Sequence, residues 1–158
     1  MNENMERYFA SLRGKRVLVL GLGVSNRPLA KLLLGAGALV TGCDRAPREQ
    51  QSPEVLALEQ RGMALRLGER YLQDLSGDLA FRTPGMHPDL PELKALRQSG
   101  TAMTSEMEVF FEVCPCPIIA VTGSDGKTTT TTLISELLKR AGKTVWLGGN
   151  IGTPLLPL

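Results

Sequence analysis

The sequence is poor in the residues that most often bind metals or act as catalytic acids and bases. Its 158 residues include one histidine and three cysteines. Cys43 stands alone, and Cys114 and Cys116 lack the histidine or second cysteine pair that completes a zinc site. We therefore expect three reduced, partly buried thiols. The histidine, His87, has no evident Ser, Cys or carboxylate partner, and we interpret it as a loop residue.

Strong charge and long apolar runs are also missing. Lys and Arg number 18 against 16 Asp and Glu, and the longest basic feature is the short stretch 45–48. Proteins that bind nucleic acid or anionic membranes usually gather Lys and Arg on one face, so neither partner is expected. No run of about 18 apolar residues exists to cross a bilayer, and residues 1–13 lack the apolar stretch of a secretory signal. We expect a cytoplasmic globular protein.

The first regular pattern is a strand, a tight turn, a helix and a second strand. The apolar run 17–20 ends on Gly21-Leu22-Gly23, and apolar residues then recur at helical spacing up to Ala36. Gly35 and Gly37 close the helix, and 38–43 reads as a strand that ends in Asp44. The spacing predicts a βαβ unit with parallel strands, because only a crossover helix returns the chain to the same end of a sheet.

The α/β alternation continues to a pair of prolines. The patterns predict helices over 53–61 and 91–98, strands over 63–67 and 79–82, and a capping box at Ser105 and Glu108. Pro115 and Pro117 then interrupt the pattern. The sequence therefore predicts a Rossmann-like, parallel-sheet α/β domain over 1–114 and a second domain that starts at 115.

The second domain is predicted as a single βαβ unit. Its elements are a strand over 118–122, a helix over 128–141 and a strand over 144–147. About 40 residues cannot bury a self-sufficient core, so the chain looks truncated inside this domain. We expect the strand to find few partners and the helix to expose its apolar face.

The strongest functional motif runs from Gly123 to Thr129, after an apolar run and at the start of a helix. Glycines at 123 and 126 let several backbone N–H groups turn toward one point, and the helix N-terminus and Lys127 add positive charge. Thr128, the first hydroxyl after the lysine, is placed to ligate Mg²⁺ bridging nucleotide phosphates. The spacing G-x-x-G-K-T is shorter than the general G-x-x-x-x-G-K-[ST] pattern. The motif predicts a phosphate-binding loop.

A second candidate site starts at Gly21. The motif is like a dinucleotide fingerprint in which Asn26 replaces the third glycine, with Asp44 placed 21 residues after Gly23. The residues leave open an NAD site, a turn without ligand, or a site for a different nucleotide. The loop 83–86 follows another strand, so it is expected at the same carboxyl edge of the sheet. Asn150, flanked by glycines, could offer an amide to a substrate.

Together these motifs resemble the Mur ligase family. Gly21-Leu22-Gly23-Val24-Ser25, Thr83-Pro84-Gly85-Met86, the stretch 122–130 and Gly148-Gly149-Asn150-Ile151-Gly152 follow the order and spacing of that family, from about residue 15 to 156. The resemblance implies a Rossmann-like domain that holds a UDP moiety, followed by an ATPase domain. Within the family the chain is most similar to members that join D-glutamate to UDP-N-acetylmuramoyl-L-alanine for peptidoglycan synthesis, using ATP and Mg²⁺.

The resemblance also implies roles for individual residues. The ATP-binding positions are Gly123, Ser124, Asp125, Gly126, Lys127, Thr128 and Thr129, with Lys127 on the phosphates as the catalytic residue and Thr128 on Mg²⁺. The positions around the UDP-sugar are Val24, Ser25, Asp44, Arg45, Thr83, Pro84, Gly85 and Asn150. The chain departs from the family in two respects: Asp125 stands where Asn is common, and Arg45-Ala46 stands where related enzymes often have other polar residues.

Family members carry further functional parts that would lie beyond Leu158: a magnesium-binding glutamate, a modified lysine, a substrate-binding histidine and a third domain. The resemblance therefore implies a ligase whose 158-residue part does not turn over alone. Three alternatives remain: another Mur-family ligase, acting with a different amino acid or on folate; a non-catalytic module that binds the UDP-sugar; and an NAD-dependent oxidoreductase.

Overall fold

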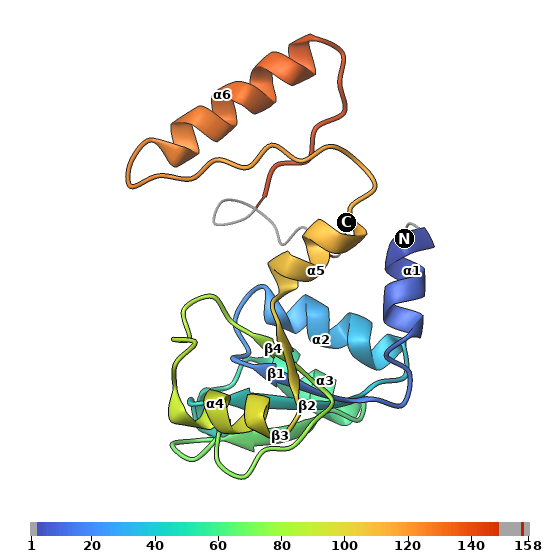
Figure 1. The fold of residues 1–158 in the computed structure, drawn as a ribbon, viewed down its shortest axis with the longest axis vertical. Helices are drawn as coiled ribbons and strands as arrows, with labels where there is room; N and C mark the ends of the chain where they lie inside the picture. Colours follow the sequence, from blue (N-terminus) through green and yellow to red (C-terminus); the bar gives the residue numbers. More distant parts are fainter. Residues whose placement is uncertain (1–2, 149–155, 157–158) are drawn as a thin grey trace.

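The computed structural model describes residues 3–148 and residue 156, and it places a parallel five-stranded sheet at the centre of the N-terminal part (Figure 1). The strands lie in the order β3-β2-β1-β4-β5. Their bounds are β1 Arg16–Leu20, β2 Leu39–Asp44, β3 Ala64–Leu67, β4 Leu79–Arg82 and β5 Ala102–Thr104. The strand order reverses at β1, between β2 and β4. The predicted α/β fold with a parallel sheet is confirmed.

The register of the central strands brings their carboxyl ends to one edge of the sheet. Leu20, the last residue of β1, pairs with Cys43 in β2 and with Arg82 in β4. The residues that follow each strand therefore leave the sheet side by side. In open α/β sheets, this edge at the reversal of strand order is where ligands bind.

The helices are α1 Glu3–Ala10, α2 Asn26–Gly35, α3 Pro53–Gln60, α4 Pro91–Gln98, α5 Glu106–Val113 and α6 Lys127–Arg140, with a short 3-10 turn η1 at Arg48–Gln50. The first five, α1 to α5, pack on the two faces of the sheet. The helices predicted over 53–61, 91–98 and 128–141 begin and end within a residue of those observed. Helix α1 and strand β5 were not predicted. None of the helices in the described part of the chain is long and apolar enough to cross a membrane.

The core lies in two layers because the side chains of β1 alternate between the sheet's faces. Val17 and Val19 belong to a cluster with residues of α1, α2, α3 and α5, whereas Leu18 and Leu20 belong to a second cluster with residues of α4. All four are almost fully buried. A strand buried on both faces is expected to be a continuous apolar run, and β1 is one from Val17 to Leu20.

The C-terminal part has a different character. Helix α6 stands away from the sheet, and the segment 114–126 reaches it as an extended chain (Figure 1). The strands predicted over 118–122 and 144–147 are absent, and this prediction was wrong for the described residues. A strand exists only through hydrogen bonds to a neighbouring strand, and these apolar segments have no such neighbour among the described residues.

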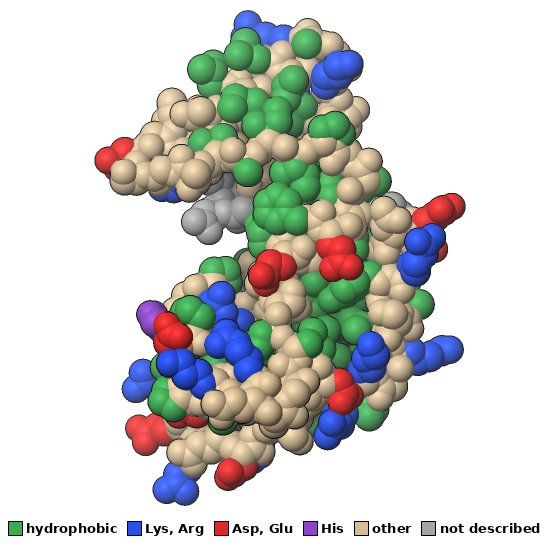
Figure 2. Space-filling model, in the orientation of Figure 1, with side chains coloured by type: hydrophobic (Ala, Val, Ile, Leu, Met, Phe, Trp, Pro, Cys, Tyr) green, Lys and Arg blue, Asp and Glu red, His purple; other side chains and the backbone are tan. Residues whose placement is uncertain are grey.

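The expected exposure of apolar side chains is present. Ile119, Leu133, Leu137 and Trp146 are 57–63% exposed, and Figure 2 shows hydrophobic side chains gathered over α6.

Leu156, the described residue nearest the C-terminus, packs against the sheet domain. Leu156 is buried in the cluster that contains α1 and α5, and its N–H donates to Oε1 of Glu106 at 3.1 Å.

Candidate nucleotide-binding sites

The turn after β1 is tied to the end of β2 by Asp44. One carboxylate oxygen, Oδ2, accepts from the Leu22 N–H at 2.7 Å, and the other, Oδ1, accepts from the Ala46 N–H at 2.9 Å. The Gly21 N–H donates to the Cys43 carbonyl at 2.7 Å. Asp44 therefore shapes the turn, and each of its oxygens keeps further acceptor capacity for a ligand.

Gly21 is required where this turn meets the loop after β4. Its φ is +89°, and a Cβ added there would lie 2.9 Å from Cγ2 of Thr83. Both the backbone conformation and the close approach exclude a side chain. Gly23 has open space around it. The first glycine of the motif thus serves packing, whereas the second lies exposed beside the turn.

Asn26 has a structural role that the sequence motif did not reveal. The side chain is 3% exposed, and its amide donates to the carbonyl of Gly21 at 2.7 Å and to that of Leu20 at 3.4 Å. It occupies the position at which a dinucleotide fingerprint has its third glycine. Instead of leaving space for close helix packing, Asn26 ties the first turn of α2 to the chain that leaves β1.

Arg82, the last residue of β4, holds the loop that follows this strand. The Met86 N–H donates to the Thr83 carbonyl at 3.1 Å, which closes a turn. The Arg82 guanidinium donates to the carbonyls of both residues from inside the loop. Pro84 and Gly85 are exposed at the tip of the turn. The structure therefore brings Thr83, Pro84 and Gly85 to the same sheet edge as Asp44 and the turn after β1.

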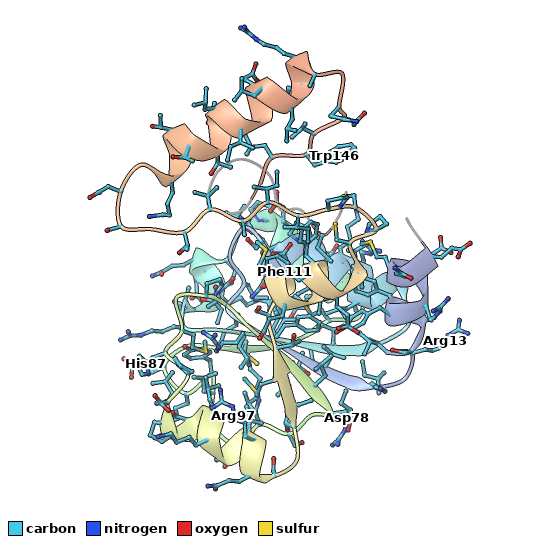
Figure 3. All side chains as sticks on the ribbon, turned by 45° about the horizontal axis from the view of Figure 1, so that its top comes forward. Arg13, Asp78, His87, Arg97, Phe111 and Trp146 are labelled. Carbon is cyan, nitrogen blue, oxygen red and sulfur yellow. The ribbon has the colours of Figure 1, made fainter. Side chains whose placement is uncertain are left out.

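Other predicted residues lie around this edge with different exposure. Val24 is 66% exposed, Arg45 is exposed, and Ser25 precedes α2 without a side-chain capping bond. His87 lies in the exposed loop before α4 (Figure 3). The expectation that it has no nearby carboxylate was wrong, because its Nδ1 lies 3.9 Å from Oδ2 of Asp89. Both groups are solvent-exposed, which agrees with a loop role for His87.

A hollow of about 520 Å³ adjoins the first site between α2 and α3. Its lining residues are Val24, Arg27, Pro28, Lys31, Glu54, Ala57, Leu58 and Arg61. Arg27 donates to Oγ of Ser52 at 3.1 Å, pairs with Glu54 and approaches the Gly23 carbonyl at 3.4 Å. Arg27 was missed from the sequence. Its place in the first turn of the helix that follows a glycine turn is the signal that could have found it.

The second site, at the start of α6, is open. Gly123 and Gly126 have φ values of +152° and +71°, and a Cβ on Gly126 would meet nothing within 4 Å. Ser124, Asp125 and Gly126 are exposed, and among the described residues their N–H groups have no hydrogen-bond acceptor. The N-terminus of α6 directly follows. Unpaired N–H groups at a helix N-terminus can bind an anion such as phosphate.

Lys127 is folded onto this loop. Its ammonium donates to the carbonyls of Gly123 and, at 3.1 Å, Ser124. The Thr128 and Thr129 side chains are exposed on the first turn of α6, and Oγ1 of Thr131 donates to the Lys127 carbonyl at 2.6 Å. The hydroxyl of Thr128 is therefore accessible to a metal ion.

The two candidate sites are separate in this structure. Among the described residues, no hydrogen bond or ion pair joins the loop 123–126 to the turns 21–25 and 83–86. Asn150, the remaining predicted site residue, lies outside the described residues.

Comparisons with known proteins agree with these motifs. The family model described as the Mur ligase middle domain matches residues 121–156. Two curated relatives, each a UDP-N-acetylmuramoylalanine--D-glutamate ligase, are 49% identical over 156 residues in Clostridium botulinum strain Hall and 50% identical over 157 residues in Ruminiclostridium cellulolyticum. The matches cover 98% and 99% of this chain but 34% of each relative, so the chain spans about a third of their length.

A solved structure shares the fold. The crystal structure of a UDP-N-acetylmuramate-alanine ligase from Thermotoga maritima matches with a TM-score of 0.53 and 23% identity, over 82% of this chain and 30% of that one. At this identity the likeness supports the fold alone. The near-half identity to the curated relatives along almost the whole chain, together with the match of residues 121–156 to the middle-domain model, leads to one conclusion: the chain belongs to the Mur ligase family.

Proposed function

We propose that this chain is the part of a D-glutamate ligase that binds UDP-N-acetylmuramoyl-L-alanine and the phosphates of ATP. The proposal is carried by the 49% identity, over 98% of the chain, to curated ligases of that specificity. In the proposed division, residues 1–114 bind the UDP-sugar and residues 115–158 begin the ATP-binding domain. The proposed setting is peptidoglycan precursor synthesis in the cytoplasm.

The reaction explains why two sites are needed. A carboxylate is a poor acyl donor, so the γ-phosphate of ATP is transferred to the free carboxylate of the UDP-linked substrate. The amine of D-glutamate then attacks the acyl phosphate and phosphate leaves. Bound Mg²⁺ supplies charge that offsets the negative oxygens of the transferred group.

The open loop at the start of α6 fits the phosphates. The unpaired N–H groups of Ser124, Asp125 and Gly126 can donate to phosphate oxygens, and the ammonium of Lys127 is within the same loop. The exposed hydroxyl of Thr128 is a suitable oxygen ligand for Mg²⁺. Asp125 adds a negative charge beside the phosphates, which opposes ATP binding.

The sheet edge fits the uridine part of the substrate. Asp44 keeps acceptor capacity on both oxygens while it holds the turn after β1, so it can accept from a ribose hydroxyl or a base N–H. Arg45 extends from the same edge as an exposed cation. Thr83, Pro84 and Gly85 lie in the loop after β4, next to the turn after β1.

Calorimetric titration tests the first site. The chain is titrated with UDP-N-acetylmuramoyl-L-alanine, as wild type and as Arg45→Ala. Loss of a charge-assisted hydrogen bond of about 1.5–3 kcal/mol predicts at least a tenfold weaker Kd. Arg70→Ala, another exposed arginine in a loop after a neighbouring strand, is the control and should bind as wild type does. No binding by wild type, or fluorescence evidence of NADH binding instead, would contradict the proposal.

A parallel titration with ATP and Mg²⁺ tests the second site. Lys127→Ala should weaken ATP binding by more than tenfold, because it removes the full positive charge of the loop. Lys139→Ala, which removes a lysine from the other end of α6, should change nothing. A chain that binds the UDP-sugar but not ATP would support the non-catalytic module instead.

A further inference from the structure

The two cysteines at the end of α5 form a pair with one fixed and one exposed member. Cys114 is the C-cap residue of α5, and its N–H donates to the Phe110 carbonyl at 2.9 Å. Cys116 is exposed on the segment that leads to the phosphate loop. Their Sγ atoms are 3.4 Å apart, and both thiols are free. The pair thus joins a helix of the sheet domain to the extended segment.

A metal site does not account for this pair. In the described ranges, 3–148 and 156, no group of three or more His, Cys, Asp or Glu side chains lies close enough to hold a metal ion. The third cysteine, Cys43, is buried in the sheet cluster that contains Leu18 and Leu20. Two thiols without further ligands fall short of the four that structural zinc requires.

The distance favours a covalent bond between the two thiols. A disulfide needs its sulfur atoms at about 2.04 Å, so the thiols must approach by about 1.4 Å from their present contact. Only one proline separates the cysteines, and the residue after them is Pro117. The exposed position of Cys116 allows a reagent in solution to reach its sulfur, whereas Cys43 is 0% exposed.

We propose that Cys114 and Cys116 form a redox modification site that exchanges with small-molecule disulfides to give an intramolecular disulfide. In the first step the thiolate of Cys116 attacks the small disulfide, forms a mixed disulfide and releases one small thiolate. In the second step the thiolate of Cys114 attacks the sulfur of Cys116 and releases the second small thiolate. The two protein thiols are oxidised, the small disulfide is reduced to two thiols, and the protons pass to water or to the leaving thiolates.

The geometry predicts that the second step is faster than the first. The hydrogen bond with Cys114 raises the pKa of the Cys116 thiol, so the initial attack involves a small thiolate fraction. Once the mixed disulfide exists, the neighbouring thiol is held beside it and the attack is intramolecular. The closed disulfide, and not the mixed one, is therefore the expected product.

The disulfide would act on the joint between the two parts of the chain. Cys114 stays fixed to α5 by its backbone hydrogen bond, so the new bond ties the start of the extended segment to the helix end. The segment 117–126 carries the open phosphate loop. The inference uses only the thiol geometry and does not depend on the proposed ligase function.

The test uses intact-protein mass spectrometry on the 158-residue chain treated with oxidised glutathione and then alkylated. Wild type should lose about 2 Da, the mass of two hydrogens, and keep one alkylatable thiol after denaturation. Cys116→Ser and Cys114→Ser cannot close the ring. Cys116→Ser should react slowly, and Cys114→Ser should gain one glutathione. Cys43→Ala is the matched control and should lose about 2 Da as wild type does.

Four outcomes would overturn the inference. The first is wild type that accumulates bound glutathione without the loss of two hydrogens. The second is oxidation that yields only disulfide-linked dimers on a non-reducing gel. Peptide mapping after protease digestion identifies the bonded pair, and a bond that includes Cys43 would also contradict it. Wild type that remains fully reduced while Cys114→Ser takes up glutathione would show that the two thiols do not close.

Discussion

Residues 3–113 and residues 114–148 both contain helices with an apolar face. In the first region that face packs against the sheet, whereas in the second much of it is exposed. Helix α2 buries Leu29 and Leu33 completely against the sheet, whereas α6 leaves Leu133 and Leu137 each 59% exposed. Figure 2 shows the result as hydrophobic side chains on the surface of α6. An amphipathic helix can form with its own hydrogen bonds, but its apolar face contributes stability only when another layer covers it.

The largest expected contrast comes from one leucine in each helix. Leu33→Ala removes a fully buried side chain from α2 and should lower the free energy of unfolding by about 2–5 kcal/mol. Leu137→Ala removes an exposed side chain from α6 and should change it by less than about 0.5 kcal/mol. Urea unfolding followed by far-UV circular dichroism measures both. Equal losses would show that α6 packs in solution as tightly as α2.

Two glycines with positive φ give the next contrast. Gly21→Ala combines backbone strain with a contact 2.9 Å from Thr83, and it should cost about 2–4 kcal/mol. Gly126→Ala meets no neighbour, so only strain of about 1–2 kcal/mol acts, at the exposed start of α6. The same urea experiment compares them. A Gly126→Ala variant as unstable as Gly21→Ala would mean that the loop is packed.

A helix cap provides a smaller test. Oγ of Ser105 accepts from the Glu108 N–H at 3.2 Å and caps α5, so Ser105→Ala should cost about 1 kcal/mol. The start of α6 has Gly126 at its cap and no side-chain capping bond. Ser124→Ala in that exposed loop is the control, with a change below about 0.5 kcal/mol. The midpoint of thermal unfolding at fixed pH distinguishes the two variants, and indistinguishable midpoints would argue against the cap.

The smallest effect concerns the contact between Glu106 in α5 and Leu156. Burial raises the pKa of the Glu106 carboxyl above its ordinary value of 4.5, although the Leu156 N–H partly opposes this. The folded state therefore holds the proton more tightly than the unfolded state. The resulting stability is present below the ordinary pKa and is lost as the pH rises through the raised one.

Glu106→Gln should remove this pH dependence and make the protein more stable than wild type at neutral pH. Glu108→Gln, two residues further along α5 and exposed, should leave the slope unchanged. The measurement is the free energy of unfolding at a series of pH values from 4 to 8. A wild-type slope that persists in Glu106→Gln would assign the titration to another group.

The same contrast explains what could be predicted from the sequence. The apolar run of β1 and the glycines that end α2 and α3 are local signals, and the sequence alone placed those elements well. Strand β5 has three residues at the edge of the sheet, too few to show alternation. Helix α1 was missed although Met5, Phe9 and Leu12 repeat at helical spacing and are buried. The strands predicted over 118–122 and 144–147 failed because a strand needs partners that local sequence does not supply.

The candidate sites divide in a similar way. The spacing of glycines after the strands β1 and β4 predicted which residues lie at the sheet edge, and the glycines at 123 and 126 predicted an open loop at the start of α6. The hydrogen-bond partners of Asp44 and Asn26 could not be predicted, since a carboxylate or amide can serve the backbone or a ligand equally well. The binding roles of these residues remain predictions for the titrations described above.

Lys127 gives the open loop a resting state of its own. With its ammonium on the carbonyls of Gly123 and Ser124, the loop does not present a bare cation to every passing anion. A phosphate group that binds as proposed above would have to draw the lysine away from two neutral oxygens, and the exchange would be favourable when the group also satisfies the unpaired N–H donors. A chloride ion offers a single acceptor atom, whereas a chain of phosphates offers several separate acceptor oxygens. The loop's selectivity would then come from competition with its own backbone.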